Sequence, residues 1–294
     1  MVKIVTEISV SKYRIISVYH SQSVESLLLS SLFESEIYQQ RFGGIARLYG
    51  VAALKTFSEA NVMVIGIGGV GTWVAESLAR SGIGRIQLMD LDDVCVTNSN
   101  RQIHALASTI GQSKVAVMAE RIKAINPLCQ VDEIEDFIAA DNLAEYLPKD
   151  SAPDYVIDCI DAVKPKAALI AWCKRNKIKI VTIGGAGGQI DPSQIKVTDL
   201  SKTVQDPLLA KVRSILRKEY GFSQNVQRKF AIDAVFSTEH LKYPKADGSV
   251  CATKEGLTGT MRMDCASGFG AVTVVTGTFG FHAVARVLQK LAAE

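Results

Sequence analysis

A short apolar segment that leads into a glycine-rich turn restricts the fold of this chain more than any other feature. Residues 62–65 read Val-Met-Val-Ile, and a Gly-x-Gly-Gly-x-Gly turn follows at residues 66–71. A strand that turns sharply into a helix leaves the first backbone N–H groups of the helix unpaired, and with the helix dipole they form an anion site. We expect Gly66 to permit the turn, Gly68, with Gly69 beside it, to let a phosphate approach, and Gly71 to allow close packing.

The residues after this unit distinguish between two kinds of nucleotide site. A dinucleotide site needs one carboxylate for the ribose, and Asp90 lies where that carboxylate is expected. Here Asp92 follows, then Asn98, the Asn-Arg-Gln segment at 100–102, and Lys114 at the start of the next expected helix. Taken alone, each amide is more readily interpreted as a turn residue and each cation as a solvated charge. Together they supply the amides and cations that a triphosphate needs while its α-phosphorus is attacked, so the set favours ATP.

These motifs resemble those of the ubiquitin-activating-like adenylating enzymes, which include the activators of small sulfur-carrier proteins. The matching residues are Gly66, Gly68, Gly69, Gly71, Asp90, Asp92, Asn98, Arg101, Gln102, Lys114 and Asp161. The resemblance implies ATP and Mg²⁺ as cofactors. It implies that Asp90 holds ribose, that Arg101 and Lys114 hold phosphates, and that Asp161 holds Mg²⁺. Mg²⁺ typically takes one or two protein carboxylates, so Asp161, with Asp92 as a second candidate, is chemically sufficient.

The same resemblance implies a role for an arginine upstream of the fold. In the family, an arginine in a Tyr-x-x-Arg-type segment reaches the γ-phosphate of the partner subunit's ATP. Arg41 matches that position best, Arg47 is a second candidate, and a plain surface charge is the alternative. A homodimer is therefore implied by the family, although nothing in the periodicity of the sequence indicates one.

Longer segments are similar to one branch of that family, the tRNA threonylcarbamoyladenosine dehydratases. They lie at residues 41–44, 100–106, 121–127, 164–170, 184–192, 235–239 and 262–270. This resemblance covers residue 38 to the C-terminus. It implies that the partner is tRNA carrying threonylcarbamoyladenosine. ATP would convert the threonine carboxylate to an acyl-adenylate with release of pyrophosphate, and ring closure would then expel AMP.

The cysteines bear on the main alternative, an activator of a ubiquitin-like or sulfur-carrier protein that transfers the acyl group to a thiol. No C-x-x-C pair is present, which argues against a structural zinc. We expect Cys95, Cys129, Cys159 and Cys173 to be buried small hydrophobes. Cys265 and Cys251 stay open as reactive groups, and so does a sulfur-transfer or cysteine desulfurase partner. A nicotinamide dehydrogenase and a non-catalytic nucleotide sensor are further alternatives, and His104 reads equally well as a nucleotide-site or a packing residue.

Apolar strands alternate with amphipathic helices, which predicts an α/β fold with a Rossmann-like, doubly wound, mostly parallel sheet. Strands are expected at 62–66, 85–90, 130–134, 155–160 and 178–183, and helices near 72–81, 113–124, 140–146, 165–176 and 207–220. Residues 1–37 match nothing and read as a poorly ordered extension. Residues 38–294 read as one adenylating-enzyme domain, with a nucleotide-binding core at about 60–190 and C-terminal substrate-specific additions at about 190–294.

Charge and hydropathy add two expectations. The net charge is only +3, but basic residues cluster with aromatic ones between 202 and 230, a composition that suits tRNA phosphates and a stacked base or, equally, a solvated helix face. The basic members are Lys202, Lys211, Arg213, Arg217, Lys218, Arg228 and Lys229, and the aromatic ones Tyr220, Phe222 and Phe230. Residues 266–285 carry no Asp, Glu, Lys or Arg and are long enough to span a bilayer. Their Ser, Thr and Gly content favours a buried helix over membrane association, and free thiols fit a cytoplasmic location.

Overall fold

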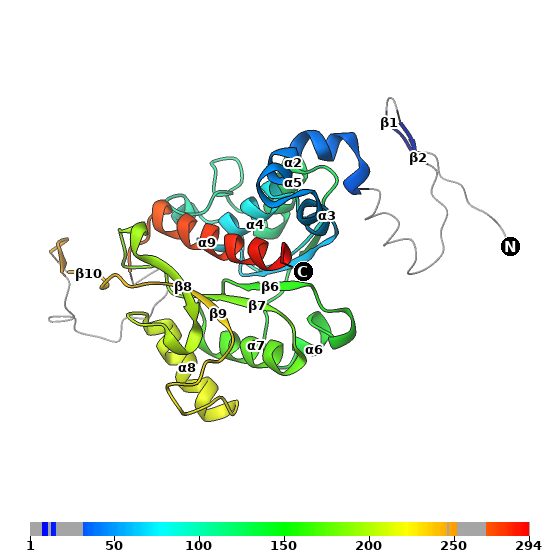
Figure 1. Ribbon diagram of the computed structural model, residues 1–294. Helices are drawn as coiled ribbons and strands as arrows, with labels where there is room; N and C mark the ends of the chain where they lie inside the picture. The colour runs from blue at the N-terminus through cyan, green and yellow to red at the C-terminus, as the bar shows by residue number, and fades with distance from the viewer. Residues whose placement is uncertain (1–7, 11–12, 16–31, 246, 252–268, 294) are drawn as a thin grey trace.

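A seven-stranded sheet forms the centre of the computed structural model, which describes residues 8–10, 13–15, 32–245, 247–251 and 269–293 (Figure 1). The strand order is β5–β4–β3–β6–β7–β9–β8, and all neighbours are parallel except the edge strand β8, which runs antiparallel to β9. The strands are β3 (Asn61–Ile65), β4 (Arg85–Met89), β5 (Gln130–Ile134), β6 (Tyr155–Asp158), β7 (Ile180–Ile183), β8 (Ile195–Asp199) and β9 (Asp233–Ser237). Two short antiparallel pairs lie outside this sheet, β1 (Ile8–Val10) with β2 (Tyr13–Ile15) and β10 (Tyr243–Pro244) with β11 (Val250–Cys251). The predicted mostly parallel α/β sheet is confirmed.

Helices cover both faces of the sheet, as a doubly wound fold requires (Figure 1). One face carries α4 (Gly71–Arg80), α5 (Lys114–Ile125) and α9 (Thr273–Leu291), with α2 (Glu36–Tyr49) and α3 (Val51–Glu59) beside them. The other carries α6 (Leu143–Tyr146), α7 (Val163–Asn176) and α8 (Pro207–Glu219). Short 3-10 helices are η1 (Val96–Asn98), η2 (Lys149–Ser151), η3 (Pro192–Gln194) and η4 (Leu200–Lys202).

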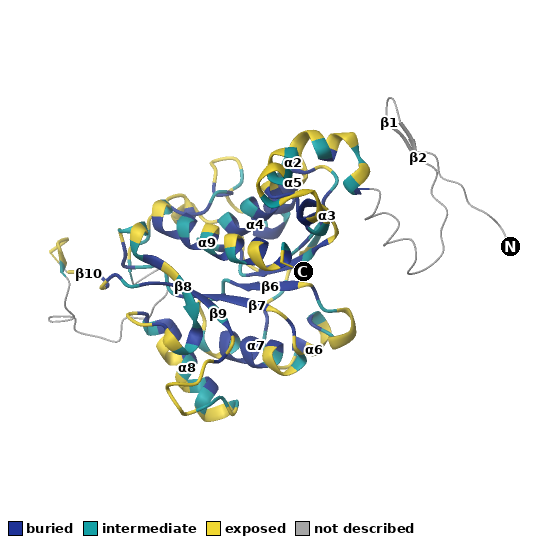
Figure 2. Cartoon of the chain, in the orientation of Figure 1, coloured by how far each residue is buried: buried dark blue, intermediate teal, exposed yellow. Residues whose placement is uncertain are grey.

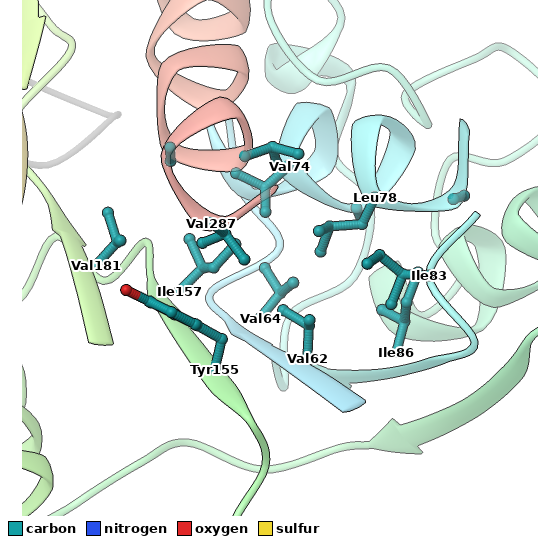
Figure 3. Close-up of a cluster of buried hydrophobic side chains, with 14 of the residues drawn as sticks. Val62, Val64, Val74, Leu78, Ile83, Ile86, Tyr155, Ile157, Val181 and Val287 are labelled. Carbon is teal, nitrogen blue, oxygen red and sulfur yellow. The ribbon is translucent and has the colours of Figure 1, made fainter. Parts of the chain in front are cut away.

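The central strands are buried on both faces, which explains their continuous apolar sequences (Figure 2). In β3, Val62 and Val64 pack with residues of α4 and α9, including Val74 and Val287 (Figure 3). Met63 and Ile65 alternate with them and belong to the cluster on the α7 and α8 side. The strand period of two therefore divides one apolar run between two cores.

The C-terminal helix α9 lies across the sheet beside α4 and is buried along one side, as expected for the apolar segment at 266–285. Its bounds differ, because the helix begins at Thr273 and continues to Leu291, through Arg286 and Lys290. Glycine allows the close approach to α4: a Cβ built at Gly280 would lie 3.1 Å from both the Val70 carbonyl oxygen and the Trp73 Cβ. Within the described residues, no helix has the length and apolar character needed to cross a membrane.

Helices α2 and α3 precede the sheet, in a region where the sequence analysis assigned no element. Leu32, Tyr38, Phe42 and Leu54 form a small apolar cluster there, and the Tyr38 hydroxyl donates to the Gly82 carbonyl oxygen at 2.5 Å. Packed structure therefore already includes Leu32, six residues before the expected domain boundary at 38.

Strand β6 ends at Asp158, two residues before the predicted end. The Asp158 carboxylate accepts a hydrogen bond from the Ile160 N–H at 3.1 Å, which turns the chain away from the sheet. This turn carries Asp161.

Candidate nucleotide-binding site

The glycine turn adopts the geometry that its sequence predicts. Gly66 has a φ of +91°, in the left-handed region, and its N–H donates to the Met89 carbonyl oxygen at 2.8 Å. A Cβ at Gly71 would lie 1.8 Å from the Gly66 carbonyl oxygen, so only glycine fits at the first residue of α4. A Cβ at Gly68 would meet no atom within 4 Å. The backbone at Gly68 therefore borders open space, as a phosphate site requires.

Asp90, at the end of β4, holds this turn closed. Its Oδ2 accepts from the Ile67 N–H at 2.6 Å, and its Oδ1 accepts from the Asp92 N–H at 2.9 Å. The side chain is nearly buried, and burial raises the pKa of the carboxyl group against the opposing effects of Lys114 and the two amides. In the described structure, both oxygens of the carboxylate expected to hold ribose are engaged by backbone amides.

Lys114 lies between the two acidic residues. Its Nζ is 2.7 Å from Asp92 Oδ2 and 3.7 Å from Asp90 Oδ1. The Lys114 side chain is only 7% exposed, whereas that of Asp92 is 58% exposed. Lys114 is thus a cation held in place at the N-terminus of α5, and one of its partners faces solvent.

Arg101 packs against the glycine turn. Its Cγ and Cδ are 3.3 Å from the position that a Cβ on Gly69 would occupy, so glycine there makes room for the arginine. Nη1 donates to the Thr97 carbonyl oxygen at 2.7 Å and to Asn100 Oδ1 at 2.9 Å. Arg101 is 8% exposed, and it forms no ion pair with any carboxylate among the described residues. A buried guanidinium without a carboxylate is suited to an anionic ligand.

Asn98 and Gln102 lie beside Arg101, but their side-chain amides differ in their hydrogen bonds. Asn98 is buried and its Oδ1 accepts from the Cys95 N–H at 2.9 Å, so it fixes the turn of η1. Gln102 is also buried, and its Oε1 has no hydrogen-bond partner within the described part of the chain. Of the two side-chain amides predicted to bind nucleotide, that of Gln102 therefore keeps an oxygen free to accept a hydrogen bond.

The N-terminal end of α9 anchors the loop that carries Arg101. Thr273 Oγ1 donates to the Asn100 carbonyl oxygen at 2.6 Å, and Asn100 Nδ2 donates to the Ala271 carbonyl oxygen at 2.8 Å. From α4, Trp73 Nε1 donates to the Arg101 carbonyl oxygen at 3.0 Å. The sequence did not indicate these long-range contacts.

His104 connects the same loop to the glycine turn. Its Nε2 is 3.2 Å from the Ile67 carbonyl oxygen, which can only accept, so in the neutral ring Nε2 carries the proton. Burial, with Lys114 nearby, lowers the pKa of His104 to about 4. Nδ1 is buried and has no partner in the described ranges. His104 is therefore a buried residue that contacts the glycine turn, which fits its reading as a packing residue, and its reading as a nucleotide-site residue stays a prediction.

Asp161 follows β6, the strand next to β3, and its side chain is exposed. The turn before it is fixed from within: Lys166 Nζ lies 3.0 Å from Asp158 Oδ2 and donates to the Ile160 carbonyl oxygen at 2.9 Å. Neither side chain of this ion pair is exposed to solvent. No role was predicted for Lys166, which shares the apolar face of α7 with Ile170, four residues on.

Gly66 and Asp161 therefore flank the point where the strand order reverses, since β3, β4 and β5 extend to one side and β6, β7 and β9 to the other. Ligands of open α/β sheets bind at this point, outside the carboxyl ends of the strands. The predicted residues at 66–71, 90–92, 98–102, 114 and 161 all lie along this edge.

Arg41 lies elsewhere. It is on α2 and exposed, and its Nη1 donates to the Ile125 carbonyl oxygen at 3.0 Å. Ile125 ends α5, whose first residue is Lys114, so the 12-residue helix separates Arg41 from the site by about 18 Å. Arg41 is not part of the nucleotide site of its own chain.

The cysteines follow the expectation in part. Cys129 and Cys173 are buried, Cys159 is half-buried, and burial raises the pKa of all three thiols. The prediction was wrong for Cys95, which is exposed because it lies at the start of η1 outside the core. Cys265 lies outside the described residues.

Five basic residues of the segment around α8 are exposed, but Phe230 belongs to the core, and Tyr220 and Phe222 pack against it. Phe230 is 3% exposed and packs edge-on against Phe222, with ring centroids 4.9 Å apart. The Arg217 guanidinium covers the Phe230 ring at 5.2 Å from its centroid. Phe230 is therefore not available to stack a base. The exposed members of the basic cluster are Lys202, Lys211, Lys218, Arg228 and Lys229.

Comparison with known proteins agrees with this site. The model of the ThiF family matches residues 42–292. The tRNA threonylcarbamoyladenosine dehydratase of Escherichia coli (strain K12) is 59% identical over 264 residues, which cover 90% of this chain and 98% of that protein. A crystal structure of the E. coli enzyme in complex with ATP has a TM-score of 0.77 at 54% identity, and one in complex with AMP a TM-score of 0.78 at 55% identity. Each alignment covers 88% of this chain and 96% of that chain.

Proposed function

The chain belongs to the ThiF family, and we propose that it catalyses the ATP-dependent dehydration of threonylcarbamoyladenosine in tRNA. The observation that carries this conclusion is the 59% identity to the E. coli dehydratase across nearly the whole length of that enzyme. The resemblance that the sequence indicated is confirmed at this level. Complexes of that enzyme with ATP and with AMP support a reaction in which ATP is consumed and AMP is formed.

The reaction begins with activation of a carboxylate, which is a poor electrophile until one oxygen becomes part of a better leaving group. An oxygen of the threonine carboxylate attacks the α-phosphorus of ATP, the bond from that phosphorus to the bridging oxygen breaks, and pyrophosphate leaves. A nitrogen or oxygen of the neighbouring carbamoyl group then attacks the activated carbonyl carbon and expels AMP. The carboxylate oxygen leaves within AMP, so the nucleoside loses the elements of water.

The residues along the sheet edge suit the first of these steps. The glycine turn presents open backbone to a phosphate, and Arg101 and Lys114 bring two positive charges beside it. We assign both cations to the phosphates of ATP, where they would neutralise the charge that develops at the α-phosphorus. Lys114 would then exchange its contact with exposed Asp92 for one with phosphate. The remaining role of the protein is to align the carboxylate with that phosphorus.

Mg²⁺ fits the residues present. The Asp161 carboxylate is exposed beside the glycine turn, and no group of three His, Cys, Asp or Glu side chains suited to a metal occurs among the described residues. One or two carboxylates completed by phosphate oxygens and waters are typical of Mg²⁺, unlike an all-protein cage. We therefore assign Mg²⁺ to Asp161, with Asp92 as the second candidate. When bound, the ion would neutralise phosphate charge.

A homodimer is part of the proposal, because Arg41 can serve a nucleotide site only across subunits. It lies at the far end of α5 from Lys114, exposed on α2. We propose that it contacts the ATP of a second copy.

The exposed basic residues around α8 are the part of the described surface that we assign to tRNA phosphates.

Mass spectrometry tests the function directly. The protein is incubated with ATP, Mg²⁺ and tRNA that carries threonylcarbamoyladenosine, and the nucleosides are analysed for the loss of one water. Substrate labelled with ¹⁸O in its carboxylate should place one labelled oxygen in AMP. Unchanged nucleoside mass with fully modified tRNA, while the E. coli enzyme is active in parallel, would refute the proposal.

The thiol-transfer alternative makes a different prediction for the same assay. An activator of a carrier protein needs a cysteine nucleophile and shows pyrophosphate exchange that depends on the carrier. For the dehydratase, Cys251→Ser and Cys265→Ser should both retain turnover, because the attacking group belongs to the substrate. Complete loss of turnover in either folded variant would favour the alternative.

A further inference from the structure

A cavity of about 300 Å³ lies beyond the ends of β7 and β9. Its polar side chains are Gln205, Asp206, Arg213 and His240, and its apolar wall is formed by Pro207, Ala210, Leu241 and Tyr243. Its lining comes from the segment that leads into α8 and from the segment after β9. Both segments belong to the part of the chain expected to carry substrate-specific additions.

The cavity opens at the same edge of the sheet as the nucleotide site. Asp206, which also lines it, accepts a hydrogen bond from the Gly185 N–H at 3.0 Å, directly after β7. Strand β7 pairs with β6, whose following turn carries Asp161. Because neighbouring strands lie about 4.8 Å apart, the cavity beyond β7 and β9 is displaced across the sheet from β6 by roughly one to two strand spacings, on the side away from the glycine turn.

The lining has the character of a site for a planar, partly apolar group. Arg213 is half-buried on α8, where its Nη1 donates to Thr203 Oγ1, and it forms no ion pair with the described residues. A guanidinium fixed in this way offers a flat face on which a base can stack. Leu241 and Tyr243 are each less than 10% exposed and supply an apolar surface.

Gln205 adds a second feature. It is exposed and has a φ of +56°, a conformation that non-glycine residues rarely adopt. Strained residues of this kind concentrate at ligand sites. The backbone here is pinned by the next residue, because Asp206 caps α8 by accepting from the Leu209 N–H at 2.9 Å.

We propose that this cavity holds the adenine base of the modified nucleoside, flipped out of the anticodon loop, while its threonine carboxylate reaches the α-phosphorus beside Asp161. This assignment rests on the proposed function. Four covalent bonds join the adenine N6 to the carboxyl carbon, a span of about one strand spacing. Enzymes that act on a base generally take it out of the stack and into a pocket.

Two variants and one control test the assignment. Arg213→Ala removes the stacking face and should lower kcat/KM for tRNA about 10- to 100-fold, with the KM for ATP changed less than about twofold. Gln205→Gly removes the amide and relieves the positive φ, so it should fold at least as well as wild type while kcat/KM falls about 3- to 10-fold. Lys174→Ala, at an exposed position on α7 outside the proposed tRNA surface, is the charge-matched control for Arg213.

Salt dependence distinguishes a base contact from a phosphate contact. If Arg213 stacks on the base, the slope of log(kcat/KM) against log[salt] should be the same for Arg213→Ala and wild type. A slope shallower by about one would assign Arg213 to a backbone phosphate and overturn the proposal. Wild-type kcat/KM in both Arg213→Ala and Gln205→Gly would overturn it as well.

A binding measurement keeps the test independent of turnover. Saturation-transfer NMR with the free nucleoside threonylcarbamoyladenosine should show transfer to the adenine protons with wild type and Lys174→Ala, and strongly reduced transfer with Arg213→Ala. This result would support the cavity even if wild type failed to dehydrate tRNA, which would refute only the proposed function. Equal transfer to wild type and Arg213→Ala would overturn the cavity assignment.

Discussion

The Lys166 ammonium lies 3.0 Å from the Asp158 carboxylate, and neither side chain is exposed to solvent. Lys166 also donates to the Ile160 carbonyl oxygen, and Asp158 accepts from Thr182 Oγ1 at 2.7 Å, so the pair ties α7 to the ends of β6 and β7. Between these contacts the chain makes the turn that presents Asp161. An exposed functional carboxylate is thus positioned by a buried ion pair.

Removing one member of this pair should be costly. Lys166→Met leaves the Asp158 carboxylate buried without its counter-ion, so we expect a loss of about 3–5 kcal/mol in the free energy of unfolding, measured by urea denaturation. Lys164→Met, at an exposed position on the same helix, should change it by no more than about 0.5 kcal/mol. A loss below about 1 kcal/mol for Lys166→Met would contradict a stabilising role for the pair.

Replacing Asp161 should reduce activity and leave the free energy of unfolding nearly unchanged. It is exposed, so Asp161→Asn should leave the free energy of unfolding within about 0.5 kcal/mol of wild type. If the carboxylate holds Mg²⁺, the same change should reduce AMP formation about 100-fold or more, because charge stabilisation at the phosphates is lost. Steady-state AMP release over a range of Mg²⁺ concentrations measures this. Wild-type turnover at low Mg²⁺ would refute the metal role.

The fold was predictable where local sequence decides it. The five strands expected from the sequence, β3 to β7, lie within two residues of their expected ends because apolar runs between turn residues define them. Helices α2 and α3 were not predicted, since their stability depends on contacts such as Tyr38 to Gly82, 44 residues apart. The start of α9 was placed at 266 instead of 273 because an uncharged run does not locate a helix end.

The candidate site was likewise predictable only in part. Glycines, carboxylates and cations were found from their spacing, because backbone geometry and phosphate chemistry require those residue types. The partners that orient them were not, because Asp158 with Lys166 and Thr273 with Asn100 meet only after folding. The cavity at Arg213 was missed for this reason too, since its walls come from two separate segments.

Arg101 should be needed for its shape as well as its charge. Nη1 already donates to two acceptors, Thr97 O and Asn100 Oδ1, and the rest of the planar guanidinium stays available to phosphate. Arg101→Lys keeps the positive charge but loses the planar guanidinium with its several N–H donors. We therefore expect kcat to fall about 10²- to 10³-fold. AMP release by a folded Arg101→Lys protein measures this. Arg80→Lys, on the mostly exposed side chain at the end of α4, is the control and should retain wild-type turnover.

Two glycine substitutions should shift stability in opposite directions. Gly280→Ala places a methyl group 3.1 Å from the Val70 oxygen and the Trp73 Cβ, so α9 must move away from α4, at a cost of about 1–3 kcal/mol. Gly43→Ala, within α2, meets no atom within 4 Å and should stabilise the protein by about 0.5–1 kcal/mol through helix propensity. Urea denaturation of both variants tests this, and equal effects would contradict the close packing of α9.

His104 should make stability depend on pH in the acidic range. Its folded-state pKa of about 4 lies below the unfolded value near 6.5, so between these values the unfolded chain binds a proton that the folded chain does not. The contribution of His104 is therefore fully present above pH 6.5 and is lost as the pH falls towards 4. The pKa difference corresponds to about 3 kcal/mol at its maximum.

The measurement is the free energy of unfolding at several pH values between 7.5 and 4 for wild type and His104→Gln. The glutamine amide can still donate to the Ile67 carbonyl oxygen but does not titrate, so the variant should lose less stability over this range, by about 3 kcal/mol. His240→Gln, at an exposed position, should keep the wild-type slope. If His104→Gln also kept that slope, the buried neutral imidazole would not be the source of the acid sensitivity.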